Sequence, residues 1–230
     1  MNAVDKIKIL STSGEPFPDR EQAGMLLARE LSEYRSRKAV VLGIPRGGVI
    51  VAKALAGELN AELDIVLAHK LRAPGYDELA MGSISERGDV FLNEDVVREL
   101  TVSDSDIQEE KAVQMAEIKR RSKLFRAVRP RIPLKGRVAI VTDDGVATGA
   151  TTQAAIKAVR AENPAELILA VPVGSEDTLR RLAVDVDMLL CLKSPWSLMA
   201  VGQFYIHFES VTDEEVLKIL KTYRVGSFVR

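Results

Sequence analysis

Two adjacent carboxylates, followed by small residues with hydroxyls, carry the clearest chemistry in this chain. Asp143 and Asp144 follow, after Thr142, four apolar residues, Val138–Val141, which predict a buried strand. The stretch Gly145–Thr152 then leads into a helical pattern over Gln153–Arg160. Small residues before a helix let backbone N–H groups approach a phosphate, and the helix dipole favours the anion. Because two acids before such a loop suit the vicinal hydroxyls of a ribose, the segment predicts a pocket for a phosphorylated sugar.

A second loop with binding chemistry follows the predicted strand Ala39–Ile44. It contains Arg46 and two adjacent glycines, Gly47 and Gly48, and it leads into a predicted helix over Val49–Leu59. Adjacent glycines allow backbone conformations that other residues avoid and let a ligand come close. The planar guanidinium of Arg46 matches the oxygens of a phosphate. The loop therefore predicts a second anion contact.

Basic side chains follow the next predicted strand, Leu63–Ala68. Lys70 and Arg72 come first, and turn signals over residues 70–92 favour a flap or hairpin over another helix. Closing such a lid would exclude water from a reactive site. An ordinary surface hairpin would explain the same composition.

Strand-like and helix-like segments alternate along the chain, which favours βαβ units. We expect one domain over residues 1–230 of the α/β class, with a central, mainly parallel sheet flanked by helices. The predicted strands are 39–44, 63–68, 138–141, 167–171 and 188–192, and the predicted helices are 20–35, 49–59, 104–126, 153–160, 176–183 and 212–223.

Composition excludes several classes of protein. No apolar stretch approaches the roughly 18 residues of a membrane span, and one cysteine, Cys191, with two histidines gives neither a disulfide framework nor a zinc site. We expect a cytoplasmic protein. The formal net charge of −1 argues against nucleic-acid binding. The one basic run, Lys119–Arg131, is interpreted as a solvated helix face, with an RNA-binding regulator as the alternative.

The strand, the acid pair and the Thr- and Gly-rich loop resemble the signature of the type I phosphoribosyltransferases. The resemblance implies a Rossmann-like core, the donor 5-phosphoribosyl 1-diphosphate, and Mg²⁺ as cofactor. Asp143 and Asp144 would bind the ribose hydroxyls and meet the metal only indirectly, through substrate or water. The residues that would hold the 5-phosphate are Gly145, Ala147, Thr148, Gly149, Ala150 and Thr151.

The same resemblance assigns the pyrophosphate group and the acceptor. The pyrophosphate contacts would be Pro45, Arg46, Gly47, Gly48 and Lys70. Arg46, Lys70 and Asp144 would be the catalytic residues, and the peptide bond between Pro45 and Arg46 would be cis. A helical insertion would cover about residues 104–128. A small hood, about residues 194–210, would grip the acceptor base. Its aromatic residues are Trp196, Phe204 and Tyr205, which would either stack on the base or belong to the core or a dimer surface.

One departure from the family pattern concerns the acceptor. Purine salvage members have an acid immediately before the Thr-Gly of the loop, where this chain has Ala147. A purine acceptor served by that carboxylate is therefore not expected. The motifs IPRGG, TDDGVATGATT and VGQFYIHF resemble a branch of predicted phosphoribosyltransferases over most of the chain. The acceptor would be a nitrogenous base, and relatives are commonly homodimers. The alternative is a regulator that senses phosphoribosyl diphosphate or a nucleotide without turnover.

Overall fold

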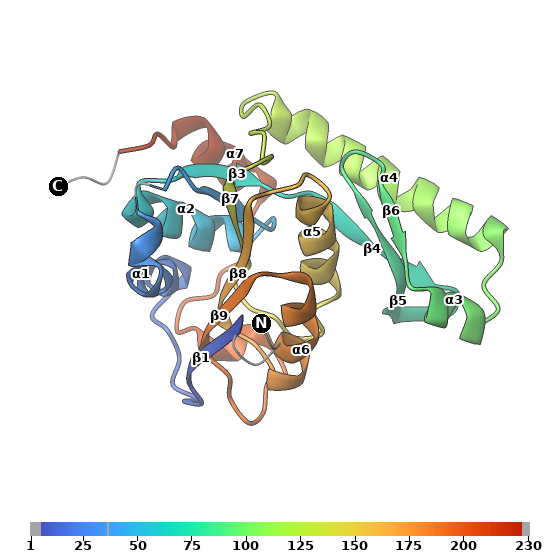
Figure 1. Cartoon of the computed structure of the whole chain (residues 1–230), viewed down its shortest axis with the longest axis horizontal. Helices are drawn as coiled ribbons and strands as arrows, with labels where there is room; N and C mark the ends of the chain where they lie inside the picture. Colours follow the sequence, from blue (N-terminus) through green and yellow to red (C-terminus); the bar gives the residue numbers. More distant parts are fainter. Residues whose placement is uncertain (1–5, 36, 227–230) are drawn as a thin grey trace.

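A six-stranded parallel sheet forms the centre of the protein (Figure 1). The computed structural model describes residues 6–35 and 37–226, without the side chains of residues 77 and 78. The strand order is β1-β9-β8-β7-β2-β3, and every pair is parallel. The strands are β1 (Ile7–Ser11), β2 (Val40–Gly43), β3 (Glu62–Ile65), β7 (Val138–Thr142), β8 (Glu166–Val173) and β9 (Met188–Lys193). The predicted fold class is confirmed.

Helices cover both faces of this sheet (Figure 1). On one face lie α1 (Arg20–Glu30) and α2 (Gly48–Leu59), and on the other lie α5 (Ala150–Arg160) and α6 (Glu176–Leu182). Successive strand residues point to opposite faces, so both faces of each central strand must be apolar. In β2, for example, Val41 packs with α1 and α2, whereas Leu42 packs with α5. The last helix, α7 (Asp213–Thr222), lies against α2.

An arm, defined here as residues 68–126, projects from one side of the sheet (Figure 1). It consists of an antiparallel sheet of β4 (Ala68–Ala73), β5 (Tyr76–Ser85) and β6 (Val90–Leu92), followed by two helices. These helices are α3 (Glu94–Glu99) and α4 (Asp104–Arg126). The arm shares one apolar core with α7, formed by buried residues such as Leu71, Met81, Ile84, Ile118, Phe125 and Leu220. It is therefore packed against the central domain at its base.

The helix α4 has the start and end signals that long helices need. Ser103 and Asp106 form a capping box, in which each side chain bonds to the backbone N–H of the other. Lys123 and Arg126 in the last turn suit the negative end of the helix dipole. Among residues 6–35 and 37–226, none of the helices combines the length and apolar character that a membrane crossing needs.

Several element bounds differ from those expected. The predicted strand 63–68 is divided between β3 and β4, because the chain leaves the edge of the central sheet at Val66. The predicted helix 20–35 ends at Glu30 and continues as a short 3₁₀ turn. Neither β1 nor α3 was predicted. The alternating exposure of β1 gives it a weak apolar signal, and α3 is only six residues long, with no buried residue.

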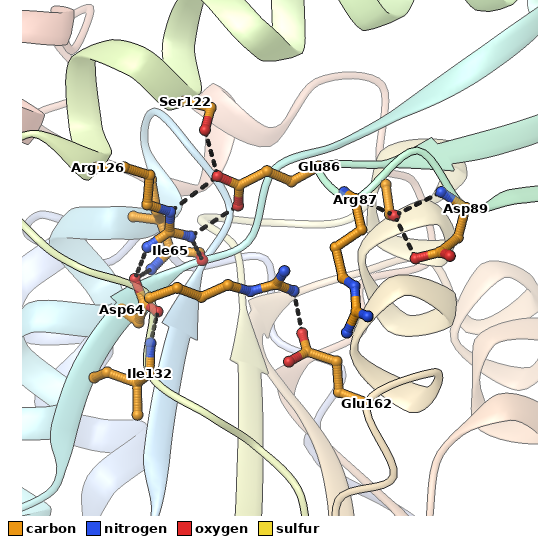
Figure 2. A network of polar contacts seen from close by, with 11 residues as sticks. Asp64, Ile65, Glu86, Arg87, Asp89, Ser122, Arg126, Ile132 and Glu162 are labelled. Atoms are coloured by element: carbon orange, nitrogen blue, oxygen red, sulfur yellow. Dashed lines mark hydrogen bonds and ion pairs between the residues drawn. The ribbon is translucent and has the colours of Figure 1, made fainter.

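One arginine joins the arm to the central sheet (Figure 2). Arg126 of α4 donates through Nη1 to Asp64 Oδ1 at 2.6 Å and through Nη2 to Glu86 Oε2 at 3.0 Å. It also donates to the carbonyl of Ile65 at 3.1 Å. Asp64 is only 1% exposed and accepts from the backbone N–H of Ile132 as well. The network thus ties β3, the turn after β5, and α4 together.

The pKa values of this network follow from its hydrogen bonds. Burial alone would raise the pKa of Glu86, but hydrogen bonds from Arg126 and Ser122 hold it below its usual value. Burial would lower the pKa of Arg126, whereas its bonds to Glu86 and Asp64 raise it. Both groups are therefore charged near neutral pH.

The basic run Lys119–Arg131 is not simply the solvated helix face that was expected. Arg126 lies in the buried network, Arg129 donates to the carbonyls of Leu220 and Tyr223, and Arg131 pairs with Glu162. Arg120 pairs with Glu117 and with Asp213 of α7. Much of this positive charge therefore holds elements of the fold together.

Replacing Arg126 with methionine should destabilise the fold by about 3–5 kcal/mol, because the buried Asp64 and Glu86 would lose their charged partner. The measurement is the free energy of unfolding in urea, with Arg180→Met as a control for an exposed pair on α6. The lowered pKa of Glu86 contributes stability above its unfolded pKa of about 4.3, and this is lost as the pH falls through the folded value. The difference between wild type and R126M should therefore shrink in acid, and equal urea midpoints at pH 7 would contradict the assignment.

Candidate functional site

The loops that follow β2 and β7 meet at the carboxyl edge of the sheet. The two strands are neighbours, with Gly43 beside Thr142, and the Ile44 N–H donates to the Thr142 carbonyl at 3.0 Å. A Cβ added to Gly47 would lie 1.9 Å from Asp144 Oδ2, and one added to Gly48 would lie 2.8 Å from the Cα of Asp143. A side chain at either position would therefore collide with the acid pair, so both positions require glycine. The two loops singled out in the sequence form one surface.

The peptide bond between Pro45 and Arg46 is cis, as the family resemblance implies. Arg46 itself is exposed.

The loop between β7 and α5 is held by the next strand and helix. Val146 N–H donates to the Val173 carbonyl at 2.8 Å, and Thr178 Oγ1 donates to the Ala147 carbonyl at 2.9 Å. Gly149 adopts a left-handed conformation, with φ of +79°, and no side chain caps the amino end of α5. The first N–H groups of a helix have no partner within the helix. This end of α5 is thus suited to an anion, with the exposed Thr148 and Thr151 beside it.

Asp144 forms an ion pair that no pattern in the sequence predicted. Arg20, the first residue of α1, donates from Nε to Asp144 Oδ2 at 2.9 Å, and its side chain is only 9% exposed. The guanidinium lies 3.8 Å from the centre of the Phe208 ring and donates to the Glu209 carbonyl at 3.0 Å. Arg20 precedes Asp144 by 124 positions, and no periodic pattern links them.

Asp143 occupies a less favourable environment than its neighbour. Burial raises the pKa of Asp143 well above its usual range, and the negative charge of Asp144 raises it further. The Asp144 N–H donates to Asp143 Oδ1 at 2.9 Å and opposes this effect in part. A cation or a hydrogen-bond donor placed beside the two carboxyl groups would favour the ionised form of Asp143.

Two hollows border the loop of Pro45 to Gly47. The first is a cleft of about 560 Å³, lined by Pro45, Lys70 and Thr151 together with residues of α4. The second is about 330 Å³ and is lined by Arg20, Arg46, Gly47 and Asp144, together with residues 208–211. The structure therefore places Arg46 with Asp144, and Lys70 with Thr151.

The three aromatic residues expected at the acceptor do not form one surface. Phe204 and Tyr205 are buried, and the Tyr205 hydroxyl donates to the Asp144 carbonyl at 2.5 Å. The Tyr205 ring stacks on Phe208, with centroids 5.1 Å apart. Trp196 is 96% exposed. The burial of Phe204 and Tyr205 in the core cluster favours the alternative of a core role for these two residues.

Comparisons with known proteins agree with this geometry. The phosphoribosyl transferase domain matches residues 16–202. Over 204 residues the chain is 43% identical to the Mycobacterium tuberculosis protein named "Putative phosphoribosyl transferase Rv0571c", which covers 89% of this chain. The match covers 46% of that protein, so the chain spans about half the length of the curated relatives it matches.

One solved structure is similar to this chain over nearly the whole length of both chains. The crystal structure of TT1426 from Thermus thermophilus superposes with a TM-score of 0.83 at 41% sequence identity, covering 90% of this chain and 98% of that one. The match to the domain spans the β2 loop, the β7 loop and the arm. The chain therefore belongs to the phosphoribosyl transferase domain family.

Proposed function

We propose that this protein transfers phosphoribose from 5-phosphoribosyl 1-diphosphate to a nitrogenous base and releases pyrophosphate. The contact between the Gly47–Gly48 loop and the Asp143–Asp144 pair is the observation that carries the proposal. It supports a site in which the exposed Arg46 lines one hollow with Asp144, and the uncapped amino end of α5 follows the acid pair along the chain. These are the groups that a ribose with a phosphate at each end requires.

The donor would bind through three sets of contacts. The ribose hydroxyls would donate to Asp144 and Asp143, and the 5-phosphate would accept from the backbone and hydroxyl groups of the loop before α5. The diphosphate would lie along Arg46, Gly47 and Gly48, with Lys70 reaching it from β4. Arg20 would fix the orientation of Asp144, because it binds one carboxylate oxygen.

In the transfer, the bond between the anomeric carbon and the diphosphate oxygen breaks and a bond from that carbon to a base nitrogen forms. The proton of that nitrogen is released. Positive charge develops on the ribose ring as the diphosphate leaves, as in other glycosyl transfers. Arg46 and Lys70 would stabilise the departing negative charge, so the contribution of the protein is mainly positioning and electrostatics.

The residues at the site fit Mg²⁺ held largely by substrate. Among the described residues, no group of three or more His, Cys, Asp or Glu side chains could form a metal cage. Mg²⁺ usually keeps several waters and takes one or two carboxylates plus substrate phosphates, which suits Asp143 and Asp144. When bound, the ion would neutralise charge on the diphosphate.

Incubation with 5-phosphoribosyl 1-diphosphate, MgCl₂ and a panel of single-ring and purine bases tests the activity. We expect pyrophosphate release that depends on at least one base. Binding of the sugar diphosphate without release for any base would contradict transfer and favour a sensing role. Because Ala147 replaces the acid that handles the base proton in purine salvage members, the acceptor would be activated in another way or would not be a free purine.

Asp144→Asn should weaken binding of 5-phosphoribosyl 1-diphosphate by roughly 10- to 100-fold, the effect of losing a hydrogen bond to a charged group. Binding of inorganic pyrophosphate should change much less, because it has no ribose. Isothermal titration calorimetry with both ligands measures the difference, and a melting curve checks that the variant is folded. An equal loss for the two ligands would show that Asp144 does not bind the ribose.

Asp143→Asn should stabilise the free protein by about 1 kcal/mol near neutral pH while impairing turnover, because it removes a carboxylate that is costly to ionise beside Asp144. The raised pKa of Asp143 means that this cost is present above the folded pKa and disappears as the pH falls to the ordinary aspartate range. The gain should therefore shrink in acid. Urea unfolding at several pH values without divalent cations measures it, and a variant less stable than wild type at pH 7 would contradict this account.

A further inference from the structure

One face of α4 lines the cleft that contains Lys70 and Thr151. The cleft residues on this helix are Val113, Gln114, Glu117 and Arg121, whose spacing of one, three and four positions places them on one side of a helix. The cleft also receives Pro45 of the β2 loop and the first turn of α5 through Thr151. The arm helix therefore faces both loops that the proposed function assigns to the donor.

Polar contacts fix α4 in this position. Glu110 accepts from the backbone N–H of Arg72 at 3.1 Å and from its Nε at 2.9 Å. Gln114 donates to Glu110 at 2.9 Å and lies 2.9 Å from His69 Nδ1. This chain of contacts joins α4 to β4 on either side of Lys70, and the Arg126 network holds the end of the helix (Figure 2).

Positive charge predominates among the side chains of the cleft. Among the described residues, Lys70, Arg72 and Arg121 line it with a single carboxylate, that of Glu117. Arg121 Nε lies 2.9 Å from Glu117 Oε1, and the Arg121 side chain is 22% exposed. Arg126, Arg129 and Arg131 of the same basic run bind other parts of the fold. Of the arginines in that run, Arg121 is the one that lines this cleft.

We propose that Arg121 of α4 binds the diphosphate of the sugar donor, so that the arm helix forms the outer wall of the donor site. The inference rests on the proposed function, because it takes the β2 loop and the α5 end as donor contacts. A guanidinium fork offers parallel N–H groups to phosphate oxygens, and a partly enclosed cleft strengthens that attraction. Arg121 Nε lies close to Glu117 but is buried without a hydrogen-bond partner, so a donor position of this guanidinium remains open to an anion.

Arg120 supplies a matched control. It is the neighbour of Arg121 on α4, pairs with the same Glu117, and carries the same charge, but it contacts Asp213 of α7 and does not line the cleft. Arg121→Gln and Arg120→Gln therefore remove one charge each from nearly the same place. Long-range electrostatic effects should be similar in the two variants.

The test is calorimetric binding of inorganic pyrophosphate and of 5-phosphoribosyl 1-diphosphate, with MgCl₂, to wild type and both variants. R121Q should weaken both ligands by about tenfold, the effect of one charge-assisted contact, whereas R120Q should bind as wild type does. Melting curves check that both variants are folded. If R121Q and R120Q bind both ligands with equal affinity while wild type binds them normally, the role of Arg121 is overturned. The proposed function would not be affected by that result. Failure of wild type to bind either ligand would overturn the proposed function together with this inference.

Discussion

The candidate site depends on the pairing of β2 with β7. Because these strands are parallel neighbours, their carboxyl ends lie side by side, and the loops that follow them must share one small space. Gly47 and Gly48 are there because a Cβ at either position would collide with the acid pair. This packing brings Arg46, which precedes the glycines, close to Asp144 of the other loop.

The central fold and both loops could be predicted because their signals are local. Runs such as Val138–Val141 are apolar on both faces, as buried parallel strands must be. The adjacent acids and adjacent glycines of the two loops can likewise be recognised from a short stretch of sequence. The edge strand β1 lacked that signal because alternate residues face solvent. The ion pair of Arg20 with Asp144 could not be found in this way, because it depends on how α1 is placed over the sheet.

The basic run on α4 shows a similar limit. Its composition favours a solvated face, but charge alone does not identify the partners of individual side chains. The fold supplies those partners. Asp64 comes from β3, Glu86 from the arm and Glu162 from the turn after α5, each distant in the sequence. Aromatic residues of the expected hood behave likewise, because burial of Phe204 and Tyr205 follows from packing that no local pattern specifies.

The Arg126 network also has a mechanical consequence. Swinging the whole arm away from the sheet would strip Asp64 and Glu86 of their shared arginine and expose the apolar core that the arm forms with α7. Separating the base of the arm from the sheet would therefore cost an ion-pair network and part of an apolar core at the same time.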